Sequence, residues 1–173
     1  MKNTYFLILL VLFSLLLQNC KETEKDSRQK TSELMTAQTL GLAYLEEFKL
    51  DEAEKEFLKV IKLAPNQKLG YANLGLAYLR MGNYEEAKKQ LFKAIQIDSN
   101  DPDVRLLLAT VYQMNDERDK AISTLLEALE IAPDHIKSLY DLTELYSIES
   151  DEESQGLRKI YIEKLVEKAS GNI

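Results

Sequence analysis

Few residues in this chain are of the types that carry out chemistry, and they lie far apart. The sequence holds one histidine, His135, and one cysteine, Cys20. A nucleophilic triad needs a base beside its nucleophile, and a zinc site needs several cysteine or histidine ligands, so this chain can build neither. His135 directly follows Pro133-Asp134, and we expect a solvent-exposed histidine in a turn. We therefore predict that the protein is not an enzyme and holds no cofactor and no metal ion.

A second candidate for chemistry is the acidic stretch 98–103, which carries oxygen ligands at a spacing that suggests a calcium loop. Asp98, Asn100, Asp101 and Asp103 stand close together, but no glycine occupies the turn position. Ala109 stands where a calcium loop needs a glutamate that binds through both oxygens. We therefore expect a turn followed by a helix cap at this place, and no metal site.

The segment that ends at Cys20 indicates a targeting signal. Residues 5–17 are apolar apart from Ser14, and these 13 residues span about 20 Å as a helix. A bilayer core needs about 30 Å, so the segment is typical of the central region of a secretory signal peptide. Leu17-Gln18-Asn19-Cys20 resembles the lipobox of bacterial lipoproteins, although the family usually has a small residue where Asn19 stands. An ordinary cleaved signal and an uncleaved anchor are the alternatives.

The lipoprotein resemblance implies a signal peptide over 1–19 and acylation of Cys20, which becomes the mature N-terminus. Acyl chains would anchor the protein stably in a membrane. Lys21 follows the cysteine in place of the aspartate that keeps many lipoproteins in the inner membrane, so the resemblance implies the outer membrane of a bacterial cell envelope. Residues 21–33 are almost wholly polar, and we interpret 20–33 as the lipidated cysteine and a tether; an extension of the first helix is the alternative.

The overall charge narrows the class of partner. The chain has 173 residues and a net charge of −7, with 45% hydrophobic and 29% charged residues, which is typical of one globular domain. No basic stripe is visible in the sequence, so we predict no nucleic-acid partner. An acidic protein is poorly attracted to anionic lipid, so membrane attachment must come from something other than general charge.

Several residue types recur at a fixed step of 34 residues. Those that keep this step are Tyr44, Tyr78, Tyr112 and Tyr146; Leu40, Leu74, Leu108 and Leu142; Ala53, Ala87 and Ala121; and Phe57, Leu91 and Leu125. A period this long is typical of repeat proteins, in which each unit buries its apolar face against its neighbours. Stacked repeats usually provide binding surfaces and not catalytic pockets, so the period favours a binding function.

The repeat divides the chain into units 34–67, 68–101, 102–135 and 136–169. Each of the first three holds two amphipathic stretches with helical spacing. In the second unit, Gly82 is expected to end the first helix and Asn83 to cap the next. Pro65 and Pro133 mark the ends of second helices, and Pro102 stands at an expected first helical position.

This pattern resembles the tetratricopeptide repeat (TPR). The second unit carries the resemblance most fully, with Tyr71, Leu74-Gly75, Tyr78, Gly82-Asn83-Tyr84, Ala87, Leu91 and Ala94. The resemblance implies an all-α, right-handed TPR solenoid of antiparallel helix pairs over 34–173, with about three full repeats and a degenerate capping repeat. Small pairs such as Gly75 with Ala87 would let two helices approach closely, and the ladder tyrosines would lie in the core.

The fourth unit departs from the pattern. Thr143 and Gln155 replace the small pair, and Lys159 stands where a core aromatic is expected. Terminal repeats are often atypical because one face meets water. We therefore interpret 152–169 as a capping helix in a shifted register, whose acidic first turn suits a helix N-terminus.

The resemblance also implies that the first helix of each unit lines a concave groove that holds a peptide or a partner helix. Our candidates for the groove are Asn73, Leu76, Arg80, Leu106, Thr110, Gln113, Tyr140 and Glu144, and other matching positions include Met35, Gln38, Leu42, Leu45, Leu69, Ala72, Met114, Lys137 and Asp141. The lysine and asparagine set of the subtype that clamps a partner's C-terminal carboxylates is missing, so we exclude that function. Asp141 and Glu144 favour a mostly hydrophobic or basic-tipped ligand, with Tyr140 and Arg80 as its main anchors.

These observations predict a membrane-tethered TPR lipoprotein that binds a protein or peptide partner as a scaffold in the bacterial cell envelope. We expect no small-molecule substrate. Two alternatives remain open at this stage: a pilotin-like accessory of a secretion machine, and a regulatory subunit of an envelope enzyme.

Overall fold

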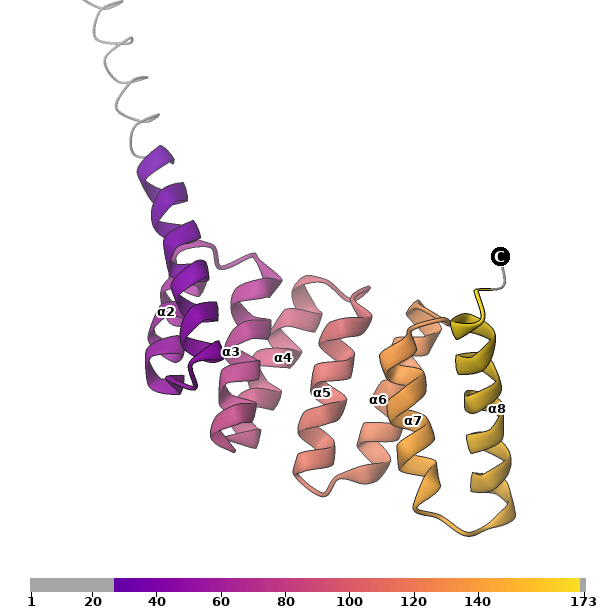
Figure 1. Cartoon of the computed structure of the whole chain (residues 1–173). Helices are drawn as coiled ribbons and strands as arrows, with labels where there is room; N and C mark the ends of the chain where they lie inside the picture. Colours follow the sequence, from indigo (N-terminus) through magenta and orange to yellow (C-terminus); the bar gives the residue numbers. More distant parts are fainter. Residues whose placement is uncertain (1–26, 172–173) are drawn as a thin grey trace, which may run out of the picture.

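The computed structural model of the protein describes residues 27–171, and their regular structure is entirely helical. An N-terminal helix, described over 27–46, precedes α2 (Leu50–Leu63), α3 (Lys68–Met81), α4 (Tyr84–Ile97), α5 (Pro102–Met114), α6 (Arg118–Ile131), α7 (Ile136–Ser147) and α8 (Glu152–Ala169). Figure 1 shows these helices as antiparallel pairs stacked side by side along the chain. The predicted all-α solenoid is thus confirmed. Over 27–171, no helix has the length and apolar character needed to cross a membrane.

The first helix begins earlier in the chain than the sequence analysis predicts. Residues 27–33, the last part of the predicted tether, are helical and exposed, and they continue directly into the first helix of the first unit. Figure 1 shows this helix reaching beyond the stack. For these residues the alternative interpretation, an extension of the first helix, is therefore the correct one. The predicted signal peptide 1–19 and Cys20 lie outside the described residues.

The 34-residue step corresponds to the packing between the two helices of each unit. Leu91 is fully buried and faces the backbone of α3, where a Cβ atom built on Gly75 would lie 2.7 Å from its Cγ. Gly41 faces Phe57 in the same way in the first unit, at 2.6 Å. The alanines of the ladder, Ala53, Ala87 and Ala121, are likewise fully buried. The predicted close approach at small residues is therefore confirmed, and it fixes which face of each helix turns inward.

The ladder tyrosines divide into two groups. Tyr112 and Tyr146 are buried, as predicted, whereas Tyr44 and Tyr78 are half-buried. The Tyr78 hydroxyl donates a hydrogen bond of 2.7 Å to Glu54 and so joins α3 to α2. Burial, together with this carboxylate, raises the pKa of Tyr78 to about 12. These contacts place the tyrosines in the packing between helices and leave them unsuited to ligand binding.

The turn between the two helices of a unit also keeps the 34-residue step. Phe48, Gly82 and Asp116 all adopt the left-handed backbone conformation, with φ of 56°, 78° and 59°. Gly82 therefore ends α3 as predicted, at no steric cost. Phe48 is a bulky residue in a conformation that costs about 1–2 kcal/mol for residues other than glycine. The predicted cap at Asn83 is wrong, because its side chain makes no capping hydrogen bond to α4.

The fourth unit shows the expected change of register. α8 covers Glu152–Ala169, and the Asp151 side chain accepts a hydrogen bond of 2.8 Å from the Ser154 amide at its start. The Tyr161 ring stacks on Tyr146 with centroids 6.0 Å apart, whereas Lys159 is exposed. Tyr161 therefore takes the core place two residues later than the 34-residue step requires. The capping helix and its shifted register are confirmed.

Candidate peptide-binding groove

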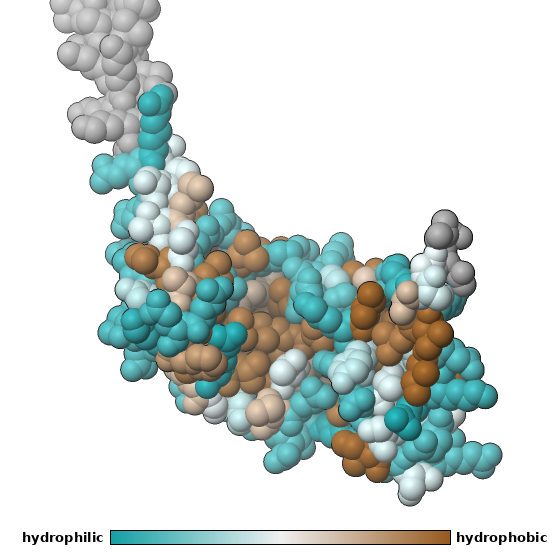
Figure 2. Space-filling view, viewed as in Figure 1, coloured by the Kyte–Doolittle hydropathy of each residue, from teal (hydrophilic) through white to brown (hydrophobic). Residues whose placement is uncertain are grey.

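The first helices of the units line the inner side of the curved stack. α3 and α5 contact each other directly, although α4 separates them in the sequence. Figure 2 shows this side, where apolar surface gathers in a hollow between the N-terminal helix and the α7–α8 end. The first helices also expose large apolar side chains, and among them are Leu42, Leu69, Met114, Ile136 and Tyr140. A stretch of apolar surface framed by polar residues is typical of a protein-interaction site.

The predicted groove residues occupy this surface to different degrees. Asn73, Leu76, Leu106, Thr110 and Gln113 are half-buried, whereas Arg80, Tyr140 and Glu144 are exposed. Leu45, one of the further positions, is only 3% exposed. It packs with Phe57 and Leu74 in the core, so its assignment to the groove is wrong.

Two amides in the groove remain available to a ligand. Within the described residues, the side chains of Asn73 and Gln113 make no hydrogen bond, although both are half-buried. Each amide offers two donors and an acceptor, which can pair with the backbone of an extended segment. The Thr110 hydroxyl instead donates to the Leu106 carbonyl of its own helix, 2.9 Å away, so its proton is already used.

Arg80 is engaged within the chain. Its Nη1 donates a hydrogen bond of 2.6 Å to the carbonyl of Leu45, and its guanidinium lies 5.5 Å from the centre of the Phe48 ring. These contacts join the end of α3 to the end of the N-terminal helix. The one sequence signal for this role is that Phe48 stands 34 residues before Gly82.

The α7 end of the groove carries two neighbouring acidic side chains. Asp141 and Glu144 lie one helical turn apart, next to the exposed ring of Tyr140, and neither forms an ion pair within residues 27–171. Burial, and secondarily the charge of Glu144, raises the pKa of Asp141 above its ordinary 3.8. Two like charges on a partly desolvated surface repel each other, so a cationic group placed between them would be favoured.

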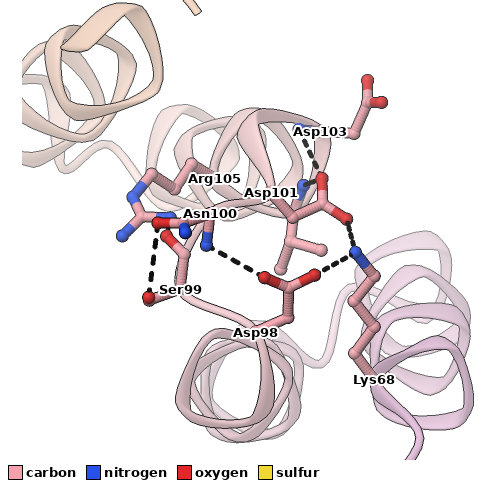
Figure 3. A network of polar contacts seen from close by, with 8 residues as sticks. Lys68, Asp98, Ser99, Asn100, Asp101, Asp103 and Arg105 are labelled. Atoms are coloured by element: carbon pink, nitrogen blue, oxygen red, sulfur yellow. Dashed lines mark hydrogen bonds and ion pairs between the residues drawn. The ribbon is translucent and has the colours of Figure 1, made fainter. Parts of the chain in front are cut away.

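The acidic stretch 98–103 has a partner of its own. Lys68 at the start of α3 places its Nζ 2.5 Å from both Asp98 and Asp101, and Asp101 also accepts hydrogen bonds from the amides of Asp103 and Val104 at the start of α5 (Figure 3). The ammonium group therefore stands among the carboxylates, and the predicted turn with a helix cap is confirmed.

His135 is not the exposed histidine that we predicted. Its side chain is only 16% exposed, with Nε2 3.3 Å from a carboxylate oxygen of Asp103. Its Nδ1 lies 2.7 Å from the Ser138 hydroxyl. His135 thus joins the start of α7 to the start of α5, as one polar link between neighbouring units.

Comparisons with known proteins identify the class. Three family models, each described as a tetratricopeptide repeat, match residues 37–67, 69–101 and 90–143. Together they span more than half of the chain, which therefore belongs to the tetratricopeptide repeat proteins. Proteins of this fold serve as protein-interaction modules, in which stacked repeats present an extended binding surface. A comparison of the sequence with curated proteins gave no significant match.

Solved structures with the same fold include MamA, with a TM-score of 0.67 and 26% identity over 79% of this chain and 78% of that one. The TPR domain of Arabidopsis OM64 matches with a TM-score of 0.64 and 18% identity, over 69% of this chain and 99% of that one. The second TPR domain of human RPAP3, in complex with an HSP70 peptide, matches with a TM-score of 0.62 and 21% identity, over 67% of this chain and 97% of that one. An O-GlcNAc transferase of Thermobaculum terrenum also matches, with 22% identity and a TM-score of 0.66, over 76% of this chain but only 25% of that protein, so such repeats also occur beside further domains.

Proposed function

We propose that this protein is a TPR lipoprotein of the bacterial cell envelope that holds a segment of another protein in its concave groove. It acts there as an interaction scaffold and catalyses no reaction itself. The observation that carries the binding half is the combination of exposed apolar side chains, free amides and an unpaired acidic pair on one inner surface. These are the features that hold the side chains, the backbone and a cation of a bound segment.

The chemistry of the groove favours a particular class of segment. The apolar hollow between the N-terminal helix and α7 suits aliphatic or aromatic side chains (Figure 2). At the α7 end, Asp141 and Glu144 suit a lysine or arginine, whereas Arg80 of α3 is already bonded to Leu45. The partner of the RPAP3 domain is an acidic peptide, SGPTIEEVD, and an acidic segment would be repelled from Asp141 and Glu144. We therefore infer an apolar segment that carries a basic residue.

A photo-crosslinking experiment tests this function in cells that express the full chain. A photoreactive phenylalanine analogue at Tyr140 in the groove is expected to give a discrete crosslinked product with a partner protein. The same analogue at Leu126, which α6 exposes on the opposite side of the solenoid, serves as the matched control. The proposal is wrong if Leu126 gives the product and Tyr140 does not, or if neither position gives one.

The tether half of the proposal is supported by the sequence around Cys20. An apolar run over 5–17 and a lone cysteine three residues after its end fit acylation, and Lys21 supports export to the outer membrane. With two or more acyl chains, anchoring would be stable, and the scaffold would act at the membrane surface.

Replacing Cys20 by serine removes the only thiol that acylation can use. We expect a fatty-acid analogue supplied to growing cells to label the natural chain and to leave Cys20→Ser unlabelled. The variant should also move from the membrane fraction to the soluble fraction if its signal segment is still cleaved. Equal labelling of the two chains would contradict acylation at Cys20, whatever their location.

A further inference from the structure

A second apolar surface runs along the outer side of the solenoid, and the groove does not use it. The second helix of each of the first three units exposes one large apolar side chain at the 34-residue step: Leu58, Phe92 and Leu126, which are 47%, 46% and 37% exposed. Phe92 directly follows the buried ladder residue Leu91, so its side chain points about 100° away around the helix. Equivalent positions in stacked units form a line, and these three residues define an outer stripe.

In the first two units, lysines flank the outer stripe. Lys55 and Lys59 stand on either side of Leu58 on α2, and Lys89 and Lys93 repeat the arrangement around Phe92 on α4, again 34 residues later. All four lysines are exposed. Lys59 pairs with Glu56 at 2.9 Å, whereas the other three form no ion pair with any residue from 27 to 171.

The third unit keeps the apolar residue but loses the lysines. Ser123 and Glu127 take their places around Leu126 on α6. The cationic and apolar pattern therefore belongs to α2 and α4 alone, at the end of the solenoid nearest the N-terminus (Figure 1). The sequence showed no basic stripe, because these lysines lie in separate helices of a chain whose net charge is −7.

A shallow hollow beside Phe92 adds aromatic surface to this face. It is lined by Tyr71 of α3 together with Lys89, Gln90, Phe92, Lys93 and Gln96 of α4. The Tyr71 hydroxyl reaches the carbonyl of Pro65 at 3.2 Å, which holds the ring at the edge of α2. Two lysine side chains thus lie beside aromatic side chains in a hollow that is open to solvent.

We propose that this outer face of α2 and α4 rests on an anionic lipid surface. Lysines hold their charge at the level of lipid phosphates while their stems and the apolar residues between them enter the interface. A group of lysines on an amphipathic surface is attracted to anionic lipid by a factor of about five for each side chain. A protein partner is less suited, because one apolar residue on each helix provides no contiguous buried centre for an interface.

The position of the N-terminal segment also supports a lipid surface as the binding partner of this outer face. The apolar run ends at residue 17 and the described helix begins at residue 27, and the nine residues between can span at most about 30 Å. The N-terminal helix packs on α2 through Leu45 and Phe57. A membrane that holds the N-terminal segment is therefore within reach of α2 and α4. The inference rests on the proposed membrane attachment, and it would turn the groove away from the lipid, toward its partner.

The test uses the full chain with Cys20→Ser and a second cysteine that carries an environment-sensitive fluorophore. The label is placed at the outer face with Phe92→Cys, or in the groove with Thr110→Cys as the control. Each chain is mixed with vesicles of phosphatidylcholine alone, or of phosphatidylcholine with phosphatidylglycerol. We expect the emission at Phe92→Cys to shift to the blue on the anionic vesicles only, and the label at Thr110→Cys to stay unchanged.

Charge-reversal variants then distinguish the contribution of the lysines to lipid binding from that of the apolar side chains. Lys89→Glu with Lys93→Glu is expected to reduce the lipid-bound fraction of the label at position 92 about tenfold or more. Lys159→Glu with Lys164→Glu makes the same change of net charge at exposed positions of α8 and should have little effect. The proposal is overturned by no shift at Phe92→Cys, by an equal shift on neutral vesicles or in the groove, or by equal effects of the two double variants.

Peptide binding by the Lys89→Glu and Lys93→Glu chain distinguishes this inference from the proposed function. Retained peptide binding with lost lipid contact is expected. If the label at Phe92→Cys contacts lipid but the protein binds no peptide, the proposed peptide-binding function is wrong and the lipid-contact inference stands.

Discussion

Leu91→Ala is expected to lower the free energy of unfolding by about 2–5 kcal/mol. Leu91 is fully buried and packs against Gly75, where the backbone of α3 approaches so closely that a Cβ atom would lie 2.7 Å from the leucine. Because the glycine has no side chain that can move into the space, the cavity would remain largely empty. The loss should be large because the second unit is packed between two others, and each repeat depends on its neighbours.

Chemical denaturation followed by circular dichroism measures this change, and the next residue supplies the control. Phe92 is 46% exposed, so Phe92→Ala removes a larger side chain yet should cost less than about 1 kcal/mol. The comparison sets a fully buried residue against its exposed neighbour on the same helix. Similar losses for the two variants would contradict the packing of α4 against α3.

The second large effect is expected at the acidic end of the groove. Asp141→Lys with Glu144→Lys should weaken binding of an apolar peptide that carries one basic residue by about 10- to 100-fold, because attraction becomes repulsion. Glu163→Lys with Glu167→Lys makes the same change of net charge on exposed positions of α8 and should change the affinity little. Isothermal titration calorimetry of the three proteins with one peptide measures the difference. Equal weakening by both double variants would indicate a general charge effect and no site.

The pH dependence of peptide binding tests the role of Asp141 independently. Burial and Glu144 raise the pKa of Asp141 above 3.8, so its carboxylate takes up a proton earlier on acidification than an ordinary aspartate. Affinity for the cationic peptide should therefore fall as the pH falls through this raised pKa. For the free protein the sign is opposite: the folded state holds the proton more tightly, so this residue favours folding as the pH falls toward 3.8. A peptide with the basic residue replaced should lose the pH dependence.

The parts of this fold that the sequence predicts are those that repeat. A step of 34 residues places Leu91 and its equivalents in one register, and packing then decides which faces are buried. The period does not predict the contacts between neighbouring units, such as the hydrogen bond from Arg80 to Leu45 or the contact of His135 with Asp103. Such contacts join residues far apart in the sequence, and their geometry depends on the curvature of the stack.

The groove was predictable as a set of positions and less so as a set of roles. The family pattern indicates which helix faces inward, but Leu45 lies in the core because the N-terminal helix ends against α3. The outer stripe illustrates the opposite case. Its residues keep the same 34-residue step as the core, so the period does not distinguish exposed Phe92 from buried Leu91. Only the packed structure shows which of the two is exposed.

The central claim, that the inner surface binds an apolar segment with a basic residue, is tested most directly by selecting ligands without bias. Random peptides displayed on phage are selected on the full chain, and a synthetic copy of the best binder is titrated into isotope-labelled protein by NMR. We predict selected peptides rich in apolar residues with at least one lysine or arginine, and changes in amide resonances along α3, α5 and α7, including those of Leu76, Gln113 and Glu144. Selection of acidic peptides, or changes confined to α2, α4 and α6, would contradict it.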